Sequence, residues 1–236
     1  MELNKLNISK NKMVKRFVIG DIHGRYKALK EVLKKSKFDY KKDKLIILGD
    51  IVDYGDNSYL VVEELLKIKN KVFIIGNHDK WFVNHIKSGW AGEVWLSQGG
   101  RNTLTSYRDK SFPITHQKFF DKRKYYHVED NMVFVHAGFT SSIHPSKEKK
   151  SILIWDRDLI KYARAGNKIK PWKSVFVGHT PTLNYKSTKP IKFCNLWMLD
   201  CGAGYTGKLC IMNIDTKEYW LSKKQKRIGE NINDTT

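Results

Sequence analysis

The sequence predicts an α/β fold in which a mostly parallel β-sheet covered by helices comes first and a second sheet follows. Three features lead to this prediction. Apolar, largely β-branched runs recur at 17–19, 45–48 and 72–75, as is typical of buried strands. Helical patterns connect the runs, and each run ends in a short polar loop. The 236 residues are enough for one such domain with a sizeable core.

The first part of the chain alternates strands and helices. Strands are predicted at 16–20, 44–48 and 71–75. The first connection, 26–35, places its apolar side chains on one face of a helix, and the second connection, from Val61 onward, does the same. The order β-α-β-α-β is typical of a parallel sheet with helices across its faces.

The second part has a different character. Between about 80 and 125, aromatic residues fall among polar ones at helix-like spacing, which predicts a small helical cap with aromatic side chains on its surface. Because the later strand-like segments are separated mostly by loops, we expect them to form a second, more antiparallel sheet packed against the first. These segments are 125–128, 132–136, 174–177, 197–200 and 209–214.

The two ends of the chain are polar. We expect residues 1–15 to form a flexible basic arm and 222–236 a flexible tail, around a single domain at 16–221. The first residues lack the apolar core of a signal peptide, and no apolar stretch approaches the ~18 residues that a spanning helix needs. A cytoplasmic protein without a membrane partner is therefore expected.

Charge and cysteine content leave partners open. Lys and Arg number 44 against 24 Asp and Glu, a net charge of +20. The excess indicates either a polyanionic partner such as nucleic acid or only the Lys-rich residue usage of an AT-rich genome, which the scattered positions favour. Cys194, Cys201 and Cys210 lack metal-finger spacing, so we expect small buried thiols in a reducing compartment. No pattern in the sequence fixes an oligomeric state.

Side chains of metal-binding type follow the three early strands. The loops read GDIHG, GDIVD and GNHD, and strand ends of a parallel sheet meet at one crevice. Asp21 and His23 are two positions apart in an extended segment, so both can reach one cation. Asp50 can bridge to a second cation, and Asn77 offers it an amide oxygen. We therefore expect a two-metal phosphoesterase centre.

Later residues supply the remaining roles. His136 and His179 each end a predicted strand and can complete the two metal shells. Two metal ions roughly 3.5–4 Å apart activate a water between them and hold phosphate oxygens for in-line attack. His78 suits a general acid for the leaving oxygen, and Asp53 suits the carboxylate that orients it.

Each of these patterns has a plainer interpretation when taken alone. A single Asp-x-His or Gly-Asn-His is often only a turn, and one histidine after a strand is often a core residue. The joint spacing favours a site, because Asp50 follows Asp21 by 29 positions and Asn77 follows Asp50 by 27. Each interval is the length of one strand–helix unit, which places the three loops side by side.

These stretches resemble the signature motifs of the phosphoprotein phosphatase family of calcineurin-like metallophosphoesterases, in its phage and bacterial branch. The early loops are similar to GDxHG, GDxVDRG and GNH[DE], and GGRNTLTSY is similar to GGxxTLxSY. Further similar elements are VHAG at 135–138, IWDR at 154–157, GHTP at 178–181 and LDCGAG at 199–204. The resemblance spans about residues 16–221.

The resemblance implies a four-layer fold, with two mixed β-sheets sandwiched and flanked by helices and a small helical cap. It implies His78 as general acid paired with Asp53. It also implies two divalent metal ions, usually Mn²⁺, with Fe, Zn, Ni and Co as alternatives. Their ligands would be Asp21, His23, Asp50, Asn77, His136 and His179.

One position departs from the family pattern. An Arg that grips the substrate phosphate usually follows the Asp of the second motif, and this chain has Tyr54 there. A tyrosine cannot supply a bidentate cationic fork. Arg157 is our first candidate for a phosphate contact, by resemblance, and Arg101 is a weaker one because a solvated surface position explains it equally well. GNHD in place of GNHE keeps the charge.

Three functions remain open from the sequence. The leading hypothesis is a metal-dependent phosphatase that uses a metal-activated hydroxide on phosphomonoesters, with phosphoserine and phosphothreonine proteins as substrates. The second is a hydrolase of dinucleoside polyphosphates, such as diadenosine tetraphosphate, or of nucleic-acid phosphates. The third is a non-catalytic nucleic-acid-binding protein on the same fold, which the complete set of ligands and the intact His78–Asp53 pair disfavour.

Overall fold

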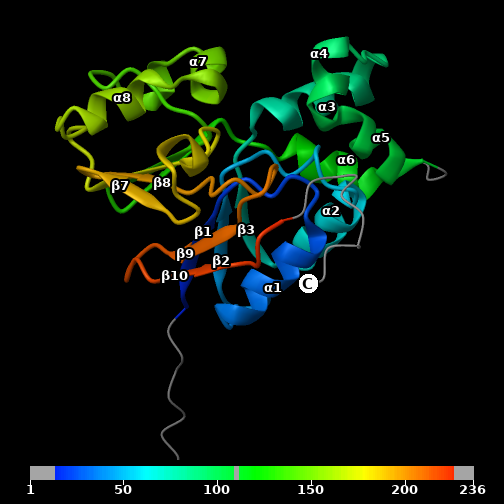
Figure 1. Ribbon diagram of the computed structural model, residues 1–236, viewed down its shortest axis with the longest axis horizontal. Coiled ribbons are helices and arrows are strands. Elements are labelled where there is room, and N and C mark those ends of the chain that lie inside the picture. Colours follow the sequence, from blue (N-terminus) through cyan, green and yellow to red (C-terminus); the bar gives the residue numbers. More distant parts are fainter. Residues whose placement is uncertain (1–13, 109–111, 226–236) are drawn as a thin grey trace, which may run out of the picture.

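Two five-stranded sheets pack face to face with helices on both outer sides (Figure 1). The computed structural model describes residues 14–108 and 112–225. The expected arm at 1–15 and tail at 222–236 therefore lie largely outside the described residues. None of the helices in the described part has the length and apolar character needed to cross a membrane.

The first sheet has the strand order β10-β9-β1-β2-β3. Parallel pairing joins β1 to β2 and β2 to β3, with Phe17 opposite Leu45, whereas β9 runs antiparallel to β1 and to β10. The strands are β1 (Arg16–Ile19), β2 (Lys44–Ile47), β3 (Asn70–Phe73), β9 (Cys210–Asn213) and β10 (Tyr219–Leu221). The helices α1 (Tyr26–Lys35) and α2 (Ser58–Leu66) connect the parallel strands, as predicted.

The second sheet has the order β4-β5-β6-β8-β7. Its central pairs β5–β6 and β6–β8 are parallel and its edge pairs are antiparallel. The strands are β4 (Tyr126–Glu129), β5 (Met132–Val135), β6 (Ser174–Val177), β7 (Ile191–Phe193) and β8 (Leu196–Met198). Its outer face is covered by α7 (Lys150–Trp155) and α8 (Asp158–Arg164), with the short turns η2 (Pro145–Lys147) and η3 (Thr182–Tyr185) at its edges.

The predicted second sheet is therefore wrong in two respects. It is evenly mixed rather than more antiparallel, and the segment at 209–214 returns to the first sheet as β9. Two helices also separate β5 from β6 where we expected loops. The short edge strands β7 and β10 lack an apolar run long enough to predict them.

Alternation of side chains along the strands builds three apolar layers. Phe17 and Ile19 point to α1, α2 and the cap, whereas Val18 between them points into the sandwich. Phe134 and Phe176 of the second sheet face Val18's layer with stacked rings at 4.8 Å. Their strand neighbours pack under α7 and α8. This is the predicted four-layer arrangement.

The cap consists of four helices and a distorted turn. They are α3 (Asn77–Ser88), α4 (Glu93–Trp95), η1 (Leu96–Gly100), α5 (Arg101–Tyr107) and α6 (Ile114–Asp121). The expectation of surface aromatic residues is wrong for most of the cap, because Trp95, Tyr107 and Phe120 are buried in its core. Trp90 is exposed.

Two of the three cysteines are buried as predicted. Cys201 and Cys210 lie in the layer between the sheets. Cys194 is exposed at the turn between β7 and β8, so the prediction is wrong for this thiol.

Candidate active site

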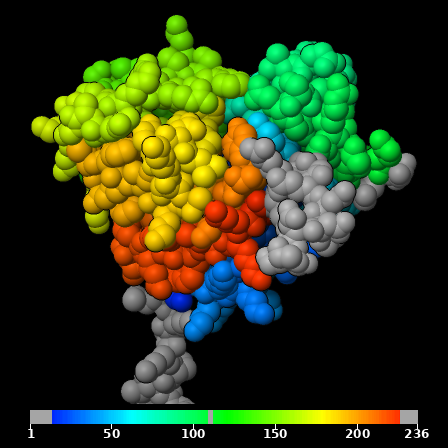
Figure 2. All heavy atoms as spheres, viewed as in Figure 1, coloured from blue at the N-terminus to red at the C-terminus, as the bar shows by residue number. Residues whose placement is uncertain are grey.

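The candidate site lies at the carboxyl ends of the parallel strands. A cavity of about 390 Å³ opens there, between Gln98 of the cap, Trp155 at the end of α7 and Arg157 just before α8. Figure 2 shows the hollow between the green cap and the yellow-green α7–α8 lobe. Both sheets contribute, because the loops after β1, β2 and β3 meet the loops after β5 and β6.

Several side chains at this edge stand on strained backbone. His23, Asp50, Asp53, Tyr54 and His179 all have positive φ values, between +47° and +70°. Side chains other than glycine rarely adopt this left-handed conformation. Such strain, which costs about 1–3 kcal/mol per residue, persists where the surrounding structure holds the residue for a purpose.

A first group of metal-binding atoms comes from Asp21, His23 and Asp50, within 4.8 Å of one another. His23 Nδ1 lies 3.0 Å from the carbonyl oxygen of Val52, so this nitrogen donates its proton there. Its Nε2 then turns a lone pair toward Asp50, 4.0 Å from Oδ2. A backbone carbonyl that fixes the tautomer in this way is a usual partner of a metal-binding histidine.

A second group comes from Asp50, His136 and His179, again within 4.8 Å. His136 Nδ1 donates to the carbonyl oxygen of Leu48 at 2.8 Å. Its Nε2 lone pair lies 3.3 Å from Asp50 Oδ2 and 3.0 Å from Asn77 Oδ1. Burial disfavours the charged ring, but Asp50 outweighs this and raises the pKa of His136, so either a proton or a metal cation has to lie between this nitrogen and the two oxygens.

The protonation states also fit metal binding. Burial, with the neighbouring His78, lowers the pKa of His23 to about 3, and burial with His136 lowers that of His179 to about 3. Both rings are therefore neutral, which is the form that binds a metal. His179 Nε2 is buried and has no hydrogen-bond partner among the described residues. The donor set fits two divalent ions, with Asp50 belonging to both groups.

Asp79 clamps two of these loops together, a role that sequence reasoning missed. Its carboxylate accepts the backbone N–H groups of Asp50 at 2.7 Å, Ile51 at 2.9 Å and Gly76 at 2.9 Å. A Cβ at Gly76 would lie 2.0 Å from Asp50 Oδ1, so only glycine allows this approach. Asp79 in the first turn of α3 also faces the positive end of the helix.

His78 and Asp53 form a buried hydrogen-bonded pair. His78 Nδ1 lies 2.7 Å from Asp53 Oδ2. The indole N–H of Trp95 donates to the same oxygen at 2.9 Å, and the hydroxyl of Thr103 donates to Oδ1 at 2.7 Å. Thr103 also accepts the backbone N–H of Asp53 at 2.8 Å, which fixes the direction of its hydroxyl. The cap thus holds Asp53 in place.

Sequence reasoning gave Trp95 and Thr103 no role. Thr103 lies in the GGRNTLTSY stretch, and its hydroxyl at that point of the motif could have indicated a role for it. Trp95 carries no signal, because nothing in its neighbourhood distinguishes it from the other aromatic residues of the cap.

The pair favours a proton on the imidazole. Burial disfavours the charged ring, but the charges of Asp50 and Asp53 outweigh this and raise the pKa of His78. Burial raises the pKa of Asp53, against the hydrogen bonds from His78, Thr103 and Trp95. Since His78 also lines the cavity, its Nε2 is available to a bound substrate.

The predicted phosphate contacts are placed differently from one another. Arg157 lines the cavity, and no hydrogen bond to a described residue holds its side chain. Tyr54 packs edge-on against His23, with 4.9 Å between ring centroids, and tilts over His78 at 5.4 Å. Arg101 pairs with Glu93 at 3.4 Å and is not among the residues that line the cavity.

The outer wall of the cavity is aromatic and amide-bearing. Tyr205 is 46% exposed and Trp155 is 41% exposed, and both line the cavity together with Leu183 and Asn184. The hydroxyl of Tyr205 lies 3.3 Å from that of Tyr54. Asp200, a buried carboxylate that the sequence analysis left without a role, lines the floor and accepts the backbone N–H of Gly202.

Comparison with known proteins identifies relatives of this arrangement. The family model for calcineurin-like phosphoesterases matches residues 14–197. Serine/threonine-protein phosphatase 1 of Salmonella typhimurium is 25% identical over 205 residues, which cover 84% of this chain and 91% of the relative. The asymmetrical bis(5'-nucleosyl)-tetraphosphatase PrpE of Oceanobacillus iheyensis is 26% identical over 249 residues, covering 92% and 96%.

A solved structure shares the fold. The crystal structure of a putative diadenosine tetraphosphatase aligns with a TM-score of 0.66 and 19% identity, over 89% of this chain and 94% of that one.

Proposed function

Because the chain belongs to the calcineurin-like phosphoesterase family, we propose that this hydrolase is a two-metal phosphomonoesterase acting on phosphoserine and phosphothreonine in proteins. One observation carries the proposal. Asp50 is shared by two groups of metal-binding atoms, and the His78–Asp53 pair stands beside them. The relative that is a serine/threonine-protein phosphatase supports the choice of substrate.

We propose that Asp21, His23 and Asp50 hold one ion and that Asp50, His136 and His179 hold the other, with Asn77 as a further ligand. Mn²⁺ is our proposal for both, since carboxylate, imidazole and amide ligands suit it. When bound, such a pair supplies an activated water and offsets the charge of the phosphate oxygens.

In this scheme His78 carries the proton that the leaving oxygen needs. Its Nδ1 is committed to Asp53, so the proton transferred is the one on Nε2. Asp53 keeps the ring in this tautomer and stabilises its charged form, and Trp95 and Thr103 keep Asp53 oriented. Arg157 lies where its guanidinium can bind the substrate phosphate from the cavity mouth.

Hydrolysis of p-nitrophenyl phosphate with and without added Mn²⁺ tests the proposal. We expect metal-dependent turnover, with the rate reduced by about 10²–10⁴ in His78→Ala and by at least as much in Asp50→Ala. His144→Ala is the matched control, because this exposed histidine does not line the cavity and, among the described residues, its side chain hydrogen-bonds only to Ser146. No metal-dependent turnover in the native chain would refute the enzyme; salt-sensitive nucleic-acid binding without turnover would favour a binding protein instead.

The exposed aromatic wall supports a second candidate, hydrolysis of dinucleoside polyphosphates. Tyr205 and Trp155 can stack on a nucleobase, and Asn184 can bond its edge. The tetraphosphatase relative is similar over nearly its whole length. Rates on phosphoserine and phosphothreonine peptides, diadenosine tetraphosphate and a 5′-phosphorylated oligonucleotide separate the candidates. A preference for diadenosine tetraphosphate that Tyr205→Ala removes would establish the second and displace the first.

A further inference from the structure

A second cavity lies at the opposite edge of the molecule, where the parallel strands begin. It has a volume of about 470 Å³ and is bordered by the start of β6, by β7 and β8, and by the turn between β9 and β10. Figure 1 shows β7 and β8 close to the β9–β10 turn. The side chains that give it its character are Lys168, Lys173, Lys192, Lys217 and Trp197; we call it the lysine cavity.

The lysine cavity has an uncompensated positive charge. No carboxylate lines it, and among the described residues none of its four lysines forms an ion pair. Lys217 is half-buried, and its ammonium group donates to the carbonyl oxygen of Ile214 and lies 4.9 Å from the Phe176 ring centroid. Asp215, on the same turn, is engaged by Arg16. The recess is thus lined by four lysines and no carboxylate, and burial lowers the pKa of one of them, Lys217, against the charge of Asp215.

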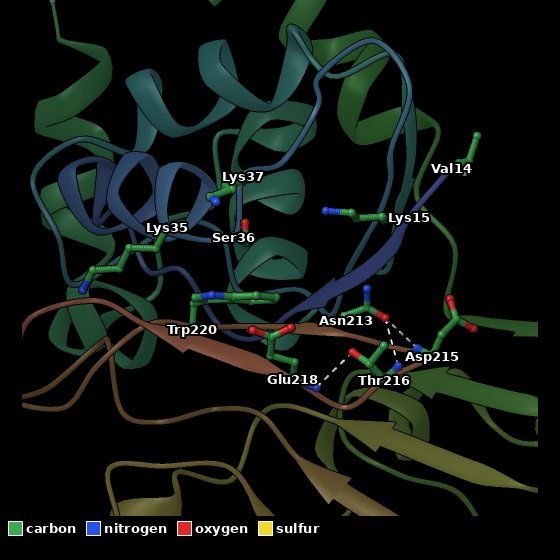
Figure 3. Close-up of a pocket in the computed structure, with 10 residues that line it drawn as sticks. All are labelled: Val14, Lys15, Lys35, Ser36, Lys37, Asn213, Asp215, Thr216, Glu218 and Trp220. Carbon is green, nitrogen blue, oxygen red and sulfur yellow. Dashed lines mark hydrogen bonds between the residues drawn. The ribbon is translucent and has the colours of Figure 1, made fainter. Parts of the chain in front are cut away.

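The cavity on the other side of the same turn provides a contrast (Figure 3). Three lysines line it, but Asp215 and Glu218 line it as well. One of its lysines, Lys35, is already paired with Glu31 at 2.7 Å. With the Lys35–Glu31 and Arg16–Asp215 pairs set aside, Lys15 and Lys37 face Glu218, so this cavity has less excess positive charge than the lysine cavity.

The aromatic residue of the lysine cavity limits the class of ligand that the cavity suits. Trp197 is half-buried and packs on the layer between the sheets, and Lys192 lies over its indole at 5.4 Å, so a base reaches the ring when the exposed Lys192 side chain turns to a phosphate. Unpaired lysines bind phosphates, and an indole among them offers a surface for a base, which is the combination that single-stranded nucleic acids use. A flat anionic membrane would contact the side chains that protrude around the cavity first, whereas a single nucleic-acid strand can enter the recess.

We propose that the lysine cavity binds a single-stranded nucleic acid, with its four lysines on the phosphodiester backbone and Trp197 against a base. The site is separate from the proposed phosphatase centre, since the two lie at opposite ends of the strands of the second sheet. It is one place where the positive charge of the chain is concentrated. A nucleic acid held here would leave the catalytic cavity open.

Fluorescence anisotropy with a labelled oligouridine of about 12 nucleotides tests the proposal, with EDTA present to prevent hydrolysis. We expect log Kd to rise with log salt concentration with a slope of up to about 3, the value for four lysine–phosphate contacts on a single strand. The double variant Lys173→Gln, Lys192→Gln should lower this slope by about 1.4 and weaken binding. Trp197→Leu should weaken oligouridine more than inorganic polyphosphate.

The matched control is the double variant Lys15→Gln, Lys37→Gln, which removes the same charge from the cavity of Figure 3. We expect it to bind like the native chain, and both double variants to keep native turnover of p-nitrophenyl phosphate and native Tm. Equal weakening in the two double variants would mean that only net charge matters and would overturn the site. Absence of oligouridine binding by the native chain at about 0.1 M salt would also overturn the site. The same holds if the variant Lys173→Gln, Lys192→Gln loses binding to phosphatidylserine vesicles but keeps its binding to oligouridine.

Discussion

The two walls of the catalytic cavity differ in how firmly they are built. The inner wall of metal-binding groups and the His78–Asp53 pair is buried, and most of its polar atoms have a defined partner. The outer wall, with Trp155, Arg157 and Tyr205, is exposed and has few partners. The chemistry common to the family needs fixed geometry, whereas substrate choice rests on side chains that can vary at little cost to the fold.

Metal removal is the most severe test of the inner wall. Burial raises the pKa of Asp79 to about 7 and of Asp200 to about 6 in the metal-free site, where other carboxylates are close. A carboxyl group with a raised pKa holds its proton more tightly in the folded state than in the unfolded state. The free energy of unfolding of the metal-free protein therefore falls as the pH rises from about 4 to the raised pKa. His23 and His179 act in the opposite direction, but only below about pH 6.5, where unfolded histidine titrates.

We therefore expect Mn²⁺ to raise Tm by more at about pH 7.5 than at about pH 6, because a bound cation favours the ionised form of the buried carboxyl groups beside it. At a thousandfold excess over Kd the gain in unfolding free energy is about 4 kcal/mol. Calorimetry of the chelator-treated protein with and without Mn²⁺ measures it. A gain that stays flat or shrinks with rising pH would contradict a cation site beside these buried carboxyl groups.

Asp53→Asn tests whether the pair on the inner wall acts as a unit. The amide cannot stabilise the imidazolium, so kcat should fall about 100-fold. Asp53 also raises the pKa of His78, so the alkaline limb of the kcat profile should move to lower pH. A lower kcat with an unmoved alkaline limb would reduce Asp53 to a packing role. Asp56→Asn, an exposed change three residues away, serves as the control.

Asp79→Asn probes the clamp behind the metal-binding loops. The amide nitrogen would face at least one of three backbone N–H groups that now donate to the carboxylate. One buried unsatisfied donor costs about 1–3 kcal/mol, so urea unfolding should show a loss of this size. Asp158→Asn, the same change on the surface, should cost under about 0.5 kcal/mol. Equal losses in the two variants would show that the clamp is not needed.

The predictability of the site follows from how each part is encoded. Asp21, Asp50 and His136 each come directly after a buried strand, so a local apolar run and the parallel order were sufficient to bring them to one edge. The contacts of Trp95 and Thr103 with Asp53 bridge 42 and 50 residues of chain, and no periodicity reports such a distance. At Asp79 the sequence shows only GNHD in place of GNHE, because hydrogen bonds to backbone N–H groups cannot be recognised from the sequence.

The same distinction explains the errors in the fold. The strand β9 shows the apolar run of a buried strand, but its place beside β1 depends on packing at the end of the sandwich rather than on any local pattern. The strands β7 and β10 have three residues each and lie at sheet edges, where half the side chains meet solvent. Local patterns therefore predicted the central strands and the longer edge strands β3 and β4, and missed only the short edge strands β7 and β10 among the described residues.

Tyr54 stands at the border between the two walls and gives the smallest expected effect. Its backbone is held by the cap, since Asn102 donates to its carbonyl oxygen at 2.8 Å, but its ring reaches toward the exposed Tyr205. In Tyr54→Arg the guanidinium should contact a bound phosphate and lower KM for p-nitrophenyl phosphate several-fold, worth about 1 kcal/mol. Tyr54→Phe is the control, because it removes only the hydroxyl bonded to Tyr205 and should leave KM near the native value. A KM that is unchanged or raised in Tyr54→Arg would place this side chain outside the phosphate subsite and would leave Arg157 as the cation to test there.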